Sequence, residues 1–292
     1  MNPRARKAVL LILVFLACAN VFAWYRVIEL AKPKFLSVIF FDIGQGDAIF
    51  IETPKGKQIL IDGGPSSKIL EKLKGVMPFY DRTLDLIVLT HPEKDHIAGL
   101  LEVLEKYKVK NILWTGSVRD TSEWLVWEDL IKKEGACVKI AQAGLRVVLD
   151  NRRQSVVFEV LYPFEALEGR KIEDSNNTSI VGRLDFGQIS FLFTGDIEKT
   201  VEEKLVDRTV QAEILKIPHH GSKSSSSEAF LKAVSAEEAV IQAGRDNPYG
   251  HPHQEVLARI QDFGIEIRRT DEDGDIKIIS DGTLLKVVSN QE

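Results

Sequence analysis

The pattern of apolar and charged residues changes near residue 26 and divides the chain into two parts. Residues 8–25 carry no charged side chain, and basic residues flank them, namely Arg4, Arg6, Lys7 and Arg26. A membrane-spanning helix needs about 20 apolar residues, whereas the apolar core of a secretory signal has about 7–15. We therefore expect an uncleaved membrane anchor at 1–26, with a cleaved signal peptide ending at 21–23 as the alternative.

The charge at the N-terminal flank predicts the side of the membrane on which each part lies. Basic residues before a first span favour a cytoplasmic N-terminus. The expected location is the cell membrane, with a single span and an extracytoplasmic catalytic domain; the alternative is secretion after signal cleavage. Residues 27–36, which include Pro33, are expected to form a linker.

Beyond residue 36, apolar runs of strand length alternate with segments of helical spacing. In the first half, the predicted strands are 37–42, 48–52, 58–62, 84–90 and 111–115, and the predicted helices are 67–73 and 97–107. In the second half, the predicted strands are 156–162, 179–186, 189–194, 212–217, 239–243, 266–270, 274–280 and 284–289, and the predicted helices are 197–205, 228–234 and 253–263. Strands with intervening helices in both halves predict two sheets covered by helices, a four-layer αββα sandwich of the α/β class in one domain at 37–290.

Composition narrows the possible classes of protein. With 292 residues, of which 44% are hydrophobic and 28% charged, the chain is predicted to be globular with a substantial core. The net charge of −5 gives no global basic footprint, which argues against a dedicated nucleic-acid coat protein. Cys18 and Cys137 both lie in apolar stretches, so we expect two buried thiols and neither a disulfide nor a cysteine zinc site.

All six histidines fall in three short clusters, each at a turn after an apolar run: His91 with His96, His219 with His220, and His251 with His253. Residues at strand ends can converge on one spot, so the clusters predict a single polar centre. Histidine and aspartate together at such a centre indicate a hydrolytic metal site.

The segment 90–100 is the strongest of these signals, because it joins a buried strand to a helix. His91, Asp95 and His96 leave the strand end in one tight loop, and imidazoles with a carboxylate suit Zn²⁺ or Mn²⁺. The alternative is a helix N-terminus with Asp95 near the cap. Asp196 follows another apolar strand and has two oxygens with which to bridge two cations, although such an aspartate alone is more commonly a helix cap.

The later histidine pairs have several possible uses. His219 and His220 could supply a ligand, a general acid or a phosphate contact. The serine-rich segment 222–227 precedes a helix, where free N–H groups favour an anion, and the alternative is a flexible polar loop. One of His251 and His253 could complete a cation's coordination while the other supports it. The spacing leaves open which member of each pair is the ligand.

These motifs resemble the metallo-β-lactamase superfamily, and more closely the soluble domain of the ComEC-type competence proteins, which are linked to DNA uptake. The segments that carry the resemblance are 42–47, 61–64, 91–96, 176–179, 194–196, 218–222 and 247–253. The resemblance implies one cation site made by Asp95, His96, Asp196 and a late histidine, for which we favour His251. It implies that His91 and Asp196 begin a second site.

Further roles follow from the same resemblance. His219 or His220 would contact or protonate a phosphate-like group, and together with Asp95 they are the predicted catalytic residues. The predicted substrate-binding residues are Asn177, Ser222, Lys223 and Ser224. The predicted supports behind the metal ligands are Asp62, Glu93 and His253.

Two departures from the superfamily pattern affect the expected metal content. Glu93 stands where the usual loop His-x-His-x-Asp-His has its second histidine, and the segment 176–179 stands where another histidine is usual. The second site is therefore poor in nitrogen ligands. We predict one tight site for Zn²⁺ or Mn²⁺ and one weak, oxygen-rich site suited to Mn²⁺ or Mg²⁺.

A third departure concerns the membrane. ComEC-type proteins carry many spans, but beyond residue 25 this sequence has no apolar run long enough to cross a bilayer. We expect the chain to act alone or beside a separate membrane channel protein.

The resulting functional hypothesis is a membrane-tethered, metal-dependent phosphodiesterase, a nuclease acting on DNA in a competence-related role. A local basic rim is predicted from Lys216, Lys223, Arg268 and Arg269. One alternative keeps the site but hydrolyses a lactone, ester or amide. The other is a non-enzymatic, metal-stabilised module that binds DNA or a partner, which the depleted second site motivates.

Overall fold

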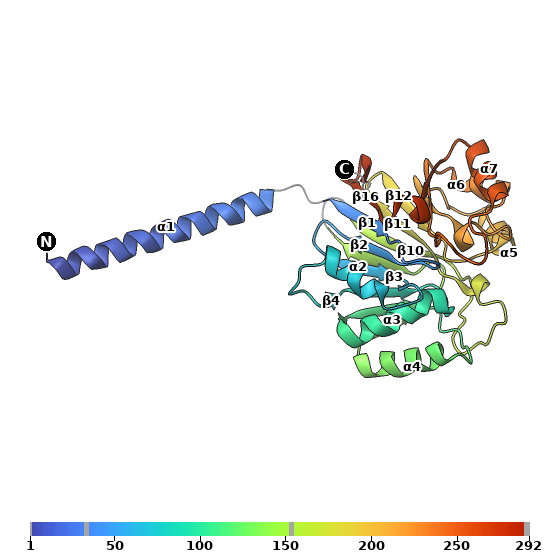
Figure 1. Ribbon diagram of the computed structural model, residues 1–292, viewed down its shortest axis with the longest axis horizontal. Helices are drawn as coiled ribbons and strands as arrows, with labels where there is room; N and C mark the ends of the chain where they lie inside the picture. The colour runs from blue at the N-terminus through green and yellow to red at the C-terminus, as the bar shows by residue number, and fades with distance from the viewer. Residues whose placement is uncertain (1, 32–34, 152–154, 289–292) are drawn as a thin grey trace. The chain divides into compact units, whose positions relative to one another are not determined.

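The computed structural model describes residues 2–31, 35–151 and 155–288, which belong to two compact units, Met1–Lys34 and Phe35–Glu292 (Figure 1). The first unit is helix α1 (Pro3–Ala31), so residues 27–31 of the predicted linker are helical, whereas 32–34 lie outside the described residues. Its segment Pro3–Val27 is long and apolar enough to cross a bilayer, a property that signal sequences share.

In the described part of the second unit, the strands form two large mixed sheets and one short pair. The first sheet has the order β17 (Leu285–Val288), β16 (Ile276–Ser280), β1 (Leu36–Phe40), β2 (Ile49–Glu52), β3 (Gln58–Ile61), β5 (Leu86–Leu89), β7 (Asn111–Trp114), β8 (Cys137–Ile140). The second sheet has the order β15 (Glu266–Arg269), β14 (Glu238–Ile241), β13 (Ile214–Lys216), β12 (Ile189–Phe193), β11 (Val181–Phe186), β10 (Val156–Tyr162), β9 (Arg146–Asp150). The short pair is β4 (Thr83–Leu84) with β6 (Lys108–Val109).

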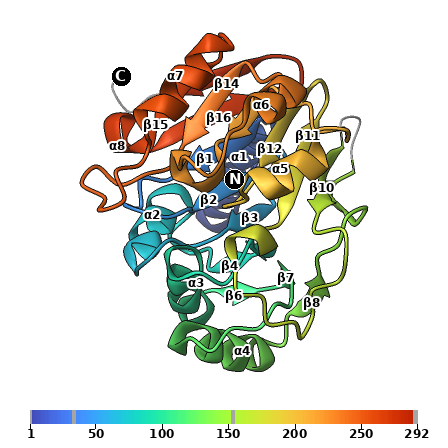
Figure 2. The same cartoon turned by 90° about the vertical axis from the view of Figure 1, so that its right-hand side faces the viewer.

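Helices cover the outer faces of both sheets. Figure 2 shows two groups of helices, one on each side of the sandwich. The first group consists of α2 (Lys68–Val76), α3 (Lys94–Lys106) and α4 (Ser122–Glu134). The second group consists of α5 (Lys199–Leu205), α6 (Glu228–Val234) and α7 (Gln254–Asp262). Three short helices lie in connections, α8 (Thr270–Asp273), η1 (Asn176–Thr178) and η2 (Pro218–Gly221).

Three apolar clusters separate the layers. The central cluster lies between the sheets, where the rings of Phe40 and Phe193 have centroids 6.2 Å apart. A second cluster joins the first sheet to α2 and α3 and includes Leu100, and a third joins the other sheet to α6 and includes Phe230. Each sheet therefore buries both faces, and the predicted four-layer αββα sandwich is confirmed.

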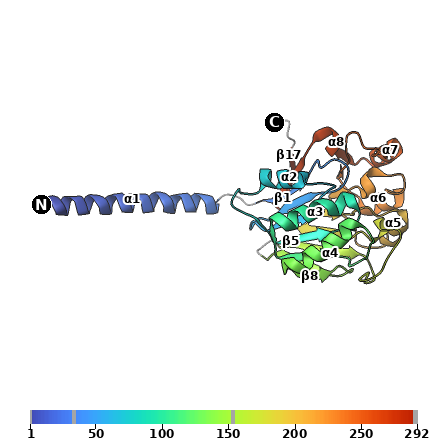
Figure 3. The same cartoon turned by 60° about the horizontal axis from the view of Figure 1, so that its bottom comes forward.

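Several predicted elements match closely, but one region of the first half was missed. The strand at 156–162 and the helix at 228–234 have the predicted bounds. Residue 289 of the last predicted strand lies outside the described residues. Helix α4 was not predicted, although Thr121 caps its start by accepting from the Trp124 N–H, and Gly135 ends it in the left-handed region. Figure 3 shows α4 beside α3. Cys18 on α1 and Cys137 on β8 are both exposed, not buried as predicted, and both are free.

The strand directions bring polar connections from both sheets to one end of the sandwich. In the first sheet, β3 and β5 run parallel, and Asp62 and Thr90 follow their ends. In the second sheet, β12 and β13 run parallel, and Asp196 and His219 lie beyond their ends. This convergence is what the histidine clusters predicted, because carboxyl ends of neighbouring parallel strands meet at one edge.

Candidate metal site

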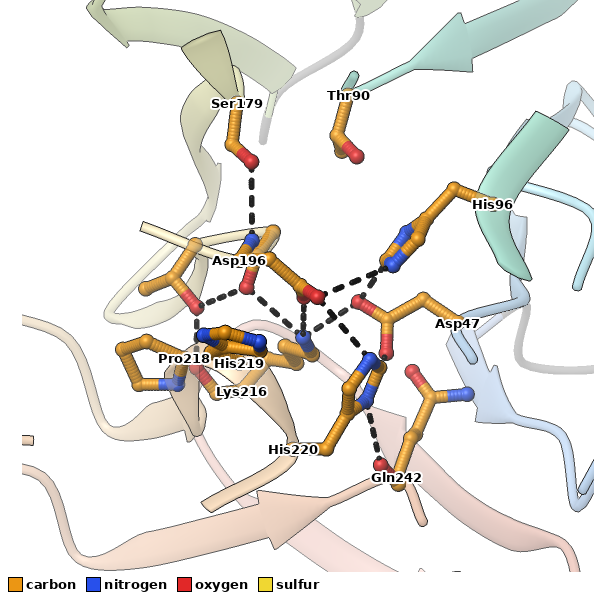
Figure 4. A network of polar contacts seen from close by, with 12 residues as sticks. Asp47, Thr90, His96, Ser179, Asp196, Lys216, Pro218, His219, His220 and Gln242 are labelled. Carbon is orange, nitrogen blue, oxygen red and sulfur yellow. Dashed lines mark hydrogen bonds and ion pairs between the residues drawn. The ribbon is translucent and has the colours of Figure 1, made fainter. Parts of the chain in front are cut away.

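The structure gathers four potential metal ligands at this end of the sandwich: Asp95, His96, Asp196 and His220, with one ligand atom of each within 4.8 Å of the others. The Asp196 Oδ2 atom lies 3.3 Å from His96 Nε2 and 3.1 Å from His220 Nε2. Figure 4 shows His96, from α3, and His220, from η2, pointing toward the Asp196 carboxylate. The Asp95 Oδ2 atom lies 3.5 Å from His220 Nε2 and completes the group.

Both histidines in this cluster are held by their other ring nitrogen. The Nδ1 atom of His96 lies 2.8 Å from Asp62 Oδ2, and that of His220 lies 2.8 Å from the backbone oxygen of Gln242. These contacts leave each Nε2 atom buried and turned toward the Asp196 carboxylate. Histidine ligands of metals are commonly fixed in this way, and two nitrogens with two carboxylates suit Zn²⁺ or Mn²⁺. The residues therefore fit a divalent cation.

His220 occupies the place for which the resemblance favoured His251. Both His219 (φ 47°) and His220 (φ 53°) adopt left-handed backbone conformations, which residues with a Cβ rarely do. This turn carries the His220 ring inward to the carboxylates. The ring of His251 lies outside the cluster, with its centroid 6.4 Å from that of His220. Burial, and then the charges of His220 and His219, lower the pKa of His251 to about 4.

His91 borders the same cluster without belonging to it. Its ring centroid lies 4.2 Å from that of His96, and its Nδ1 atom contacts Thr90 Oγ1 at 3.1 Å and Ser179 Oγ at 3.2 Å. Burial, followed by the charge of His96, lowers the pKa of His91 to about 3. Its Nε2 atom is buried, and no described residue hydrogen-bonds to it. The ring is therefore neutral and can offer a nitrogen beside Asp196.

A buried ion pair that the sequence analysis missed lies behind the cluster. The Lys216 side chain is 1% exposed; its ammonium contacts the Asp47 carboxylate and donates to the Gly195 carbonyl at 2.9 Å. It also lies 3.5 Å from Asp196 Oδ1. Burial alone would lower the pKa of Lys216, but the charges of Asp47 and Asp196 outweigh it and raise that pKa. Lys216 is therefore not the surface residue that was predicted.

The remaining arginines of the predicted basic rim are neutralised by carboxylates. Arg268 pairs with Glu238 at 3.1 Å and with Glu266 at 2.5 Å, and Arg269 pairs with Asp271 at 2.5 Å. Lys223 is the fourth predicted basic residue. Its side chain is exposed near the site, and no carboxylate among the described residues pairs with it. The prediction of a basic rim was therefore wrong for Lys216, which is buried, and for the two arginines, whose charges are paired.

The charges of the cluster balance one another through space. Burial opposes ionisation of Asp196, but His220, His96 and Lys216 hold the pKa of its carboxyl well below the usual range. Burial likewise opposes charge on His96, but Asp196 and Asp95 raise the pKa of its imidazole well above the usual range. Asp196 and Asp47 likewise raise the pKa of the His220 imidazole well above the usual range. Without a cation, protons on these two rings neutralise the carboxylates.

The predicted supporting residues take different positions. Asp62 is fully buried, has φ 57°, and accepts from the Thr90 N–H at 2.8 Å as well as contacting His96. Glu93 accepts from Arg119 at 2.6 Å and contacts Ser175. His253 lies beside His251, with ring centroids 5.1 Å apart.

A cavity of about 320 Å³ opens onto the cluster; its lining includes Asp95, Asp196, His219, His220, Tyr249 and Gln45. The His219 Nδ1 atom lies 3.3 Å from Ser224 Oγ, which in turn contacts Ser222 Oγ at 3.0 Å. Asn177 instead accepts from the Glu198 N–H at 2.9 Å and does not line this cavity. The predicted serine loop therefore meets the cavity through His219.

The helix that carries two of the ligands is held by a close backbone contact. A side chain at Gly99 in α3 would place its Cβ 1.9 Å from the Gly63 carbonyl oxygen, and the Gly99 N–H donates to the Gly64 carbonyl at 2.9 Å. Only glycine allows this approach. The loop after β3 thus fixes the first turn of α3, where Asp95 and His96 lie.

The sequence and the fold are those of a known class. Residues 41–245 match the metallo-β-lactamase superfamily, and the chain belongs to that superfamily. It is 32% identical over 256 residues to ComE operon protein 3 of Bacillus subtilis, and 33% identical over 247 residues to competence protein ComA of Neisseria gonorrhoeae. These alignments cover 81% and 82% of this chain but 32% and 31% of the relatives, so the chain spans about a third of their length. The predicted resemblance to competence proteins is confirmed.

Solved structures agree on the fold alone. The metallo-β-lactamase fold protein YhfI from Bacillus subtilis has a TM-score of 0.54 at 15% identity, covering 84% of this chain and all of that one. Igni18, a metallo hydrolase from Ignicoccus hospitalis, has a TM-score of 0.51 at 16% identity, covering 82% and 98%.

Proposed function

We propose that this chain is a metal-dependent phosphodiesterase, a nuclease that cleaves DNA. The observation that carries the proposal is the cluster of Asp95, His96, Asp196 and His220 at a cavity that His219 also borders. The likeness to proteins named for competence, a process of DNA uptake, supports DNA as the substrate.

The proposed chemistry divides among the residues by position. A divalent cation held by the four ligands would supply hydroxide near neutral pH and neutralise charge on the phosphate. His219 borders the cavity and can donate a proton to a phosphate oxygen or to the leaving oxygen. Ser224 contacts the His219 ring, and Ser222 contacts Ser224, so the two predicted substrate-binding serines would orient His219 from behind the cavity wall. Lys216 and Gln242 keep Asp196 and His220 in place without touching the substrate.

The proposed metal content is one tight cation, Zn²⁺ or Mn²⁺, in the four-residue cluster. A weaker second site would use His91 and Asp196, because the unpartnered His91 Nε2 atom borders the cluster. His251, predicted as a ligand, and His253 lie farther out and would act on the substrate side or support the loop. Metal analysis that finds two tightly held zinc ions would contradict this assignment.

We propose that α1 anchors the chain in the cell membrane as a single span, with the hydrolase domain outside the cytoplasm. The length and apolar composition of Pro3–Val27 support a span, and the basic residues before it support this direction. A separate membrane channel protein is the proposed partner for DNA passage. Removal of α1 as a signal peptide, with secretion of the remainder, is the alternative.

The test uses the full chain in detergent, stripped of metal and then supplied with Mn²⁺, Mg²⁺ or Zn²⁺. Single- and double-stranded DNA, a lactone and an ester serve as substrates. The inactive variant is Asp95→Ala/Asp196→Ala, and the matched control is Asp207→Ala/Asp262→Ala, which removes two exposed aspartates. Cation-dependent DNA cleavage that only the first variant loses supports the proposal. DNA binding without cleavage favours the non-enzymatic module, and turnover of only the lactone or ester favours the alternative hydrolase.

A further inference from the structure

An exposed aromatic ring lies at the mouth of the candidate site. Tyr249 is 63% exposed and lines the same cavity as Asp95 and Asp196. Its ring stacks on that of His251, with centroids 5.7 Å apart and an interplanar angle of 22°. One face of the tyrosine is therefore supported by protein, while most of the ring remains open to solvent beside the metal ligands.

The loop that carries Tyr249 is fixed by one asparagine. The Asn247 side-chain oxygen accepts from the N–H groups of Tyr249 at 3.2 Å and His251 at 3.0 Å. Its nitrogen donates to the carbonyls of Gly244 at 2.8 Å and His251 at 2.6 Å. The stacked pair is therefore held before any substrate arrives, which lowers the entropic cost of binding.

A second polar cavity of about 530 Å³ adjoins the first, because Gln45 lines both. Lys68 and Arg245 lie in its wall, together with the carboxylates of Asp42, Asp246 and Asp271. Arg245 donates to the backbone carbonyl of Asp271 at 3.2 Å, a neutral acceptor, so its charge is available to an anion. Lys68 shares its charge with Asp42 at 3.5 Å. A polar path of mixed charge thus leads away from the site past Gln45.

We propose that Tyr249 stacks on an unpaired nucleobase next to the cleaved phosphate. This inference rests on the proposed nuclease function and adds a specificity-determining residue to it. Aromatic side chains stack on any exposed base, whereas bases inside a duplex have both faces covered by their neighbours. Tyr249 thus favours single strands and frayed ends without selecting a sequence.

The test compares two single-stranded substrates that differ only in their bases. One is an oligothymidylate, and the other is an abasic strand of the same length with the same phosphates. For the full chain with its activating cation, kcat/KM is measured on both, and the ratio isolates the effect of the base. We expect Tyr249→Ala to lower this ratio about 5- to 150-fold, chiefly through KM, because stacking on one base gives that range. Tyr249→Phe and Tyr249→Trp should keep the ratio within about twofold, since both retain a ring.

Tyr80→Ala is the matched control, because Tyr80 is 76% exposed and does not line either cavity. An unchanged ratio in Tyr249→Ala would overturn the inference, as would equal losses in the Phe and Ala variants. If the wild type cleaves neither strand, the nuclease proposal fails separately. Fluorescence anisotropy then measures the binding of the same two strands. A preference for the base-containing strand that is lost in Tyr249→Ala supports the stacking role. Equal binding of the two strands, or no binding, overturns it.

Discussion

The Nδ1 atom of His220 and the backbone oxygen of Gln242 lie 2.8 Å apart at the ends of neighbouring parallel strands. This contact sets the ring so that Nε2 faces Asp196. We therefore expect His220→Ala to weaken binding of Zn²⁺ or Mn²⁺ by about 100-fold or more, since loss of even a supporting contact typically costs 10–100-fold. Isothermal titration of the metal-stripped protein measures this. His251→Ala should cost less than about tenfold, and the reverse order would restore His251 as the ligand.

Lys216 should contribute more to stability than any exposed lysine. Lys216→Met removes the ammonium and leaves Asp47 and Asp196 buried beside each other, so we expect a loss of about 3–5 kcal/mol in the free energy of unfolding. Urea denaturation of the metal-free protein measures it. Lys232→Met, at an exposed position on α6, should change the same quantity by less than about 0.5 kcal/mol. Equal effects of the two variants would show that the buried pair is dispensable.

Metal binding should depend on pH through the two histidines of the cluster. Despite burial, the neighbouring carboxylates raise the pKa of His96 and that of His220 well above 6.5. In the metal-free protein these protons stabilise the fold below pH 6.5, and that stabilisation is lost as the pH rises through the raised pKa values.

A cation must displace both protons, so its affinity should rise with pH above 6.5. Calorimetry in buffers of different ionisation enthalpy should show release of about two protons near neutral pH and about one in His220→Ala. An affinity that does not change with pH would mean that these rings are neutral before the metal arrives.

Substitution by alanine should change the stability of the protein in opposite directions at Gly99 and at Gly75. Gly99→Ala would push a Cβ to 1.9 Å from the Gly63 oxygen, and we expect it to destabilise the protein by about 1–3 kcal/mol and to weaken metal binding. Gly75, near the end of α2, has open space where an alanine methyl would lie, so Gly75→Ala should stabilise by about 0.5–1 kcal/mol. Thermal unfolding of both variants tests the pair, and destabilisation by both would indicate a general intolerance to added volume.

The proposed anchor predicts how the chain fractionates. The full chain should remain with membranes after an alkaline carbonate wash, because the apolar segment Pro3–Val27 can span the bilayer. A variant that lacks residues 2–31 should be released. Mass spectrometry of the N-terminus supplies the decisive reading, since a mature protein that begins after residue 23 would establish the signal-peptide alternative.

The elements that were predictable from sequence are those whose packing leaves a local pattern. The strand β5 is buried along its whole length, and its uninterrupted apolar run predicted that. Helix α4 has its signals too, since Trp124, Trp127 and Ile131 recur at helical spacing between Thr121 and Gly135. The exposed apolar side chains of Leu125 and Val126 lie between the buried ones, so the sequence of α4 shows no clear division into an apolar and a polar face.

The sequence predicted most of the residues of the candidate site, but it did not predict how their side chains are arranged. Asp95, His96 and Asp196 belong to segments with recognisable motifs. The inward orientation of His220 instead depends on a left-handed backbone conformation, which no residue type at this position predicts. Lys216 was misplaced because lysine is seldom buried without a partner. Its partner Asp47 comes from the other sheet, so only the folded chain brings the two together.

The four ligands follow strands of both sheets: Asp95 and His96 lie in the first turn of α3, after β5, and Asp196 and His220 lie in the connections after β12 and β13. A cation held by all four would act as a crosslink between the halves of the sandwich, in a chain whose cysteines are both free. Its binding free energy would add to the free energy of unfolding. Chelation should therefore weaken the packing between the two sheets, and the supply of metal would set how long the folded protein persists.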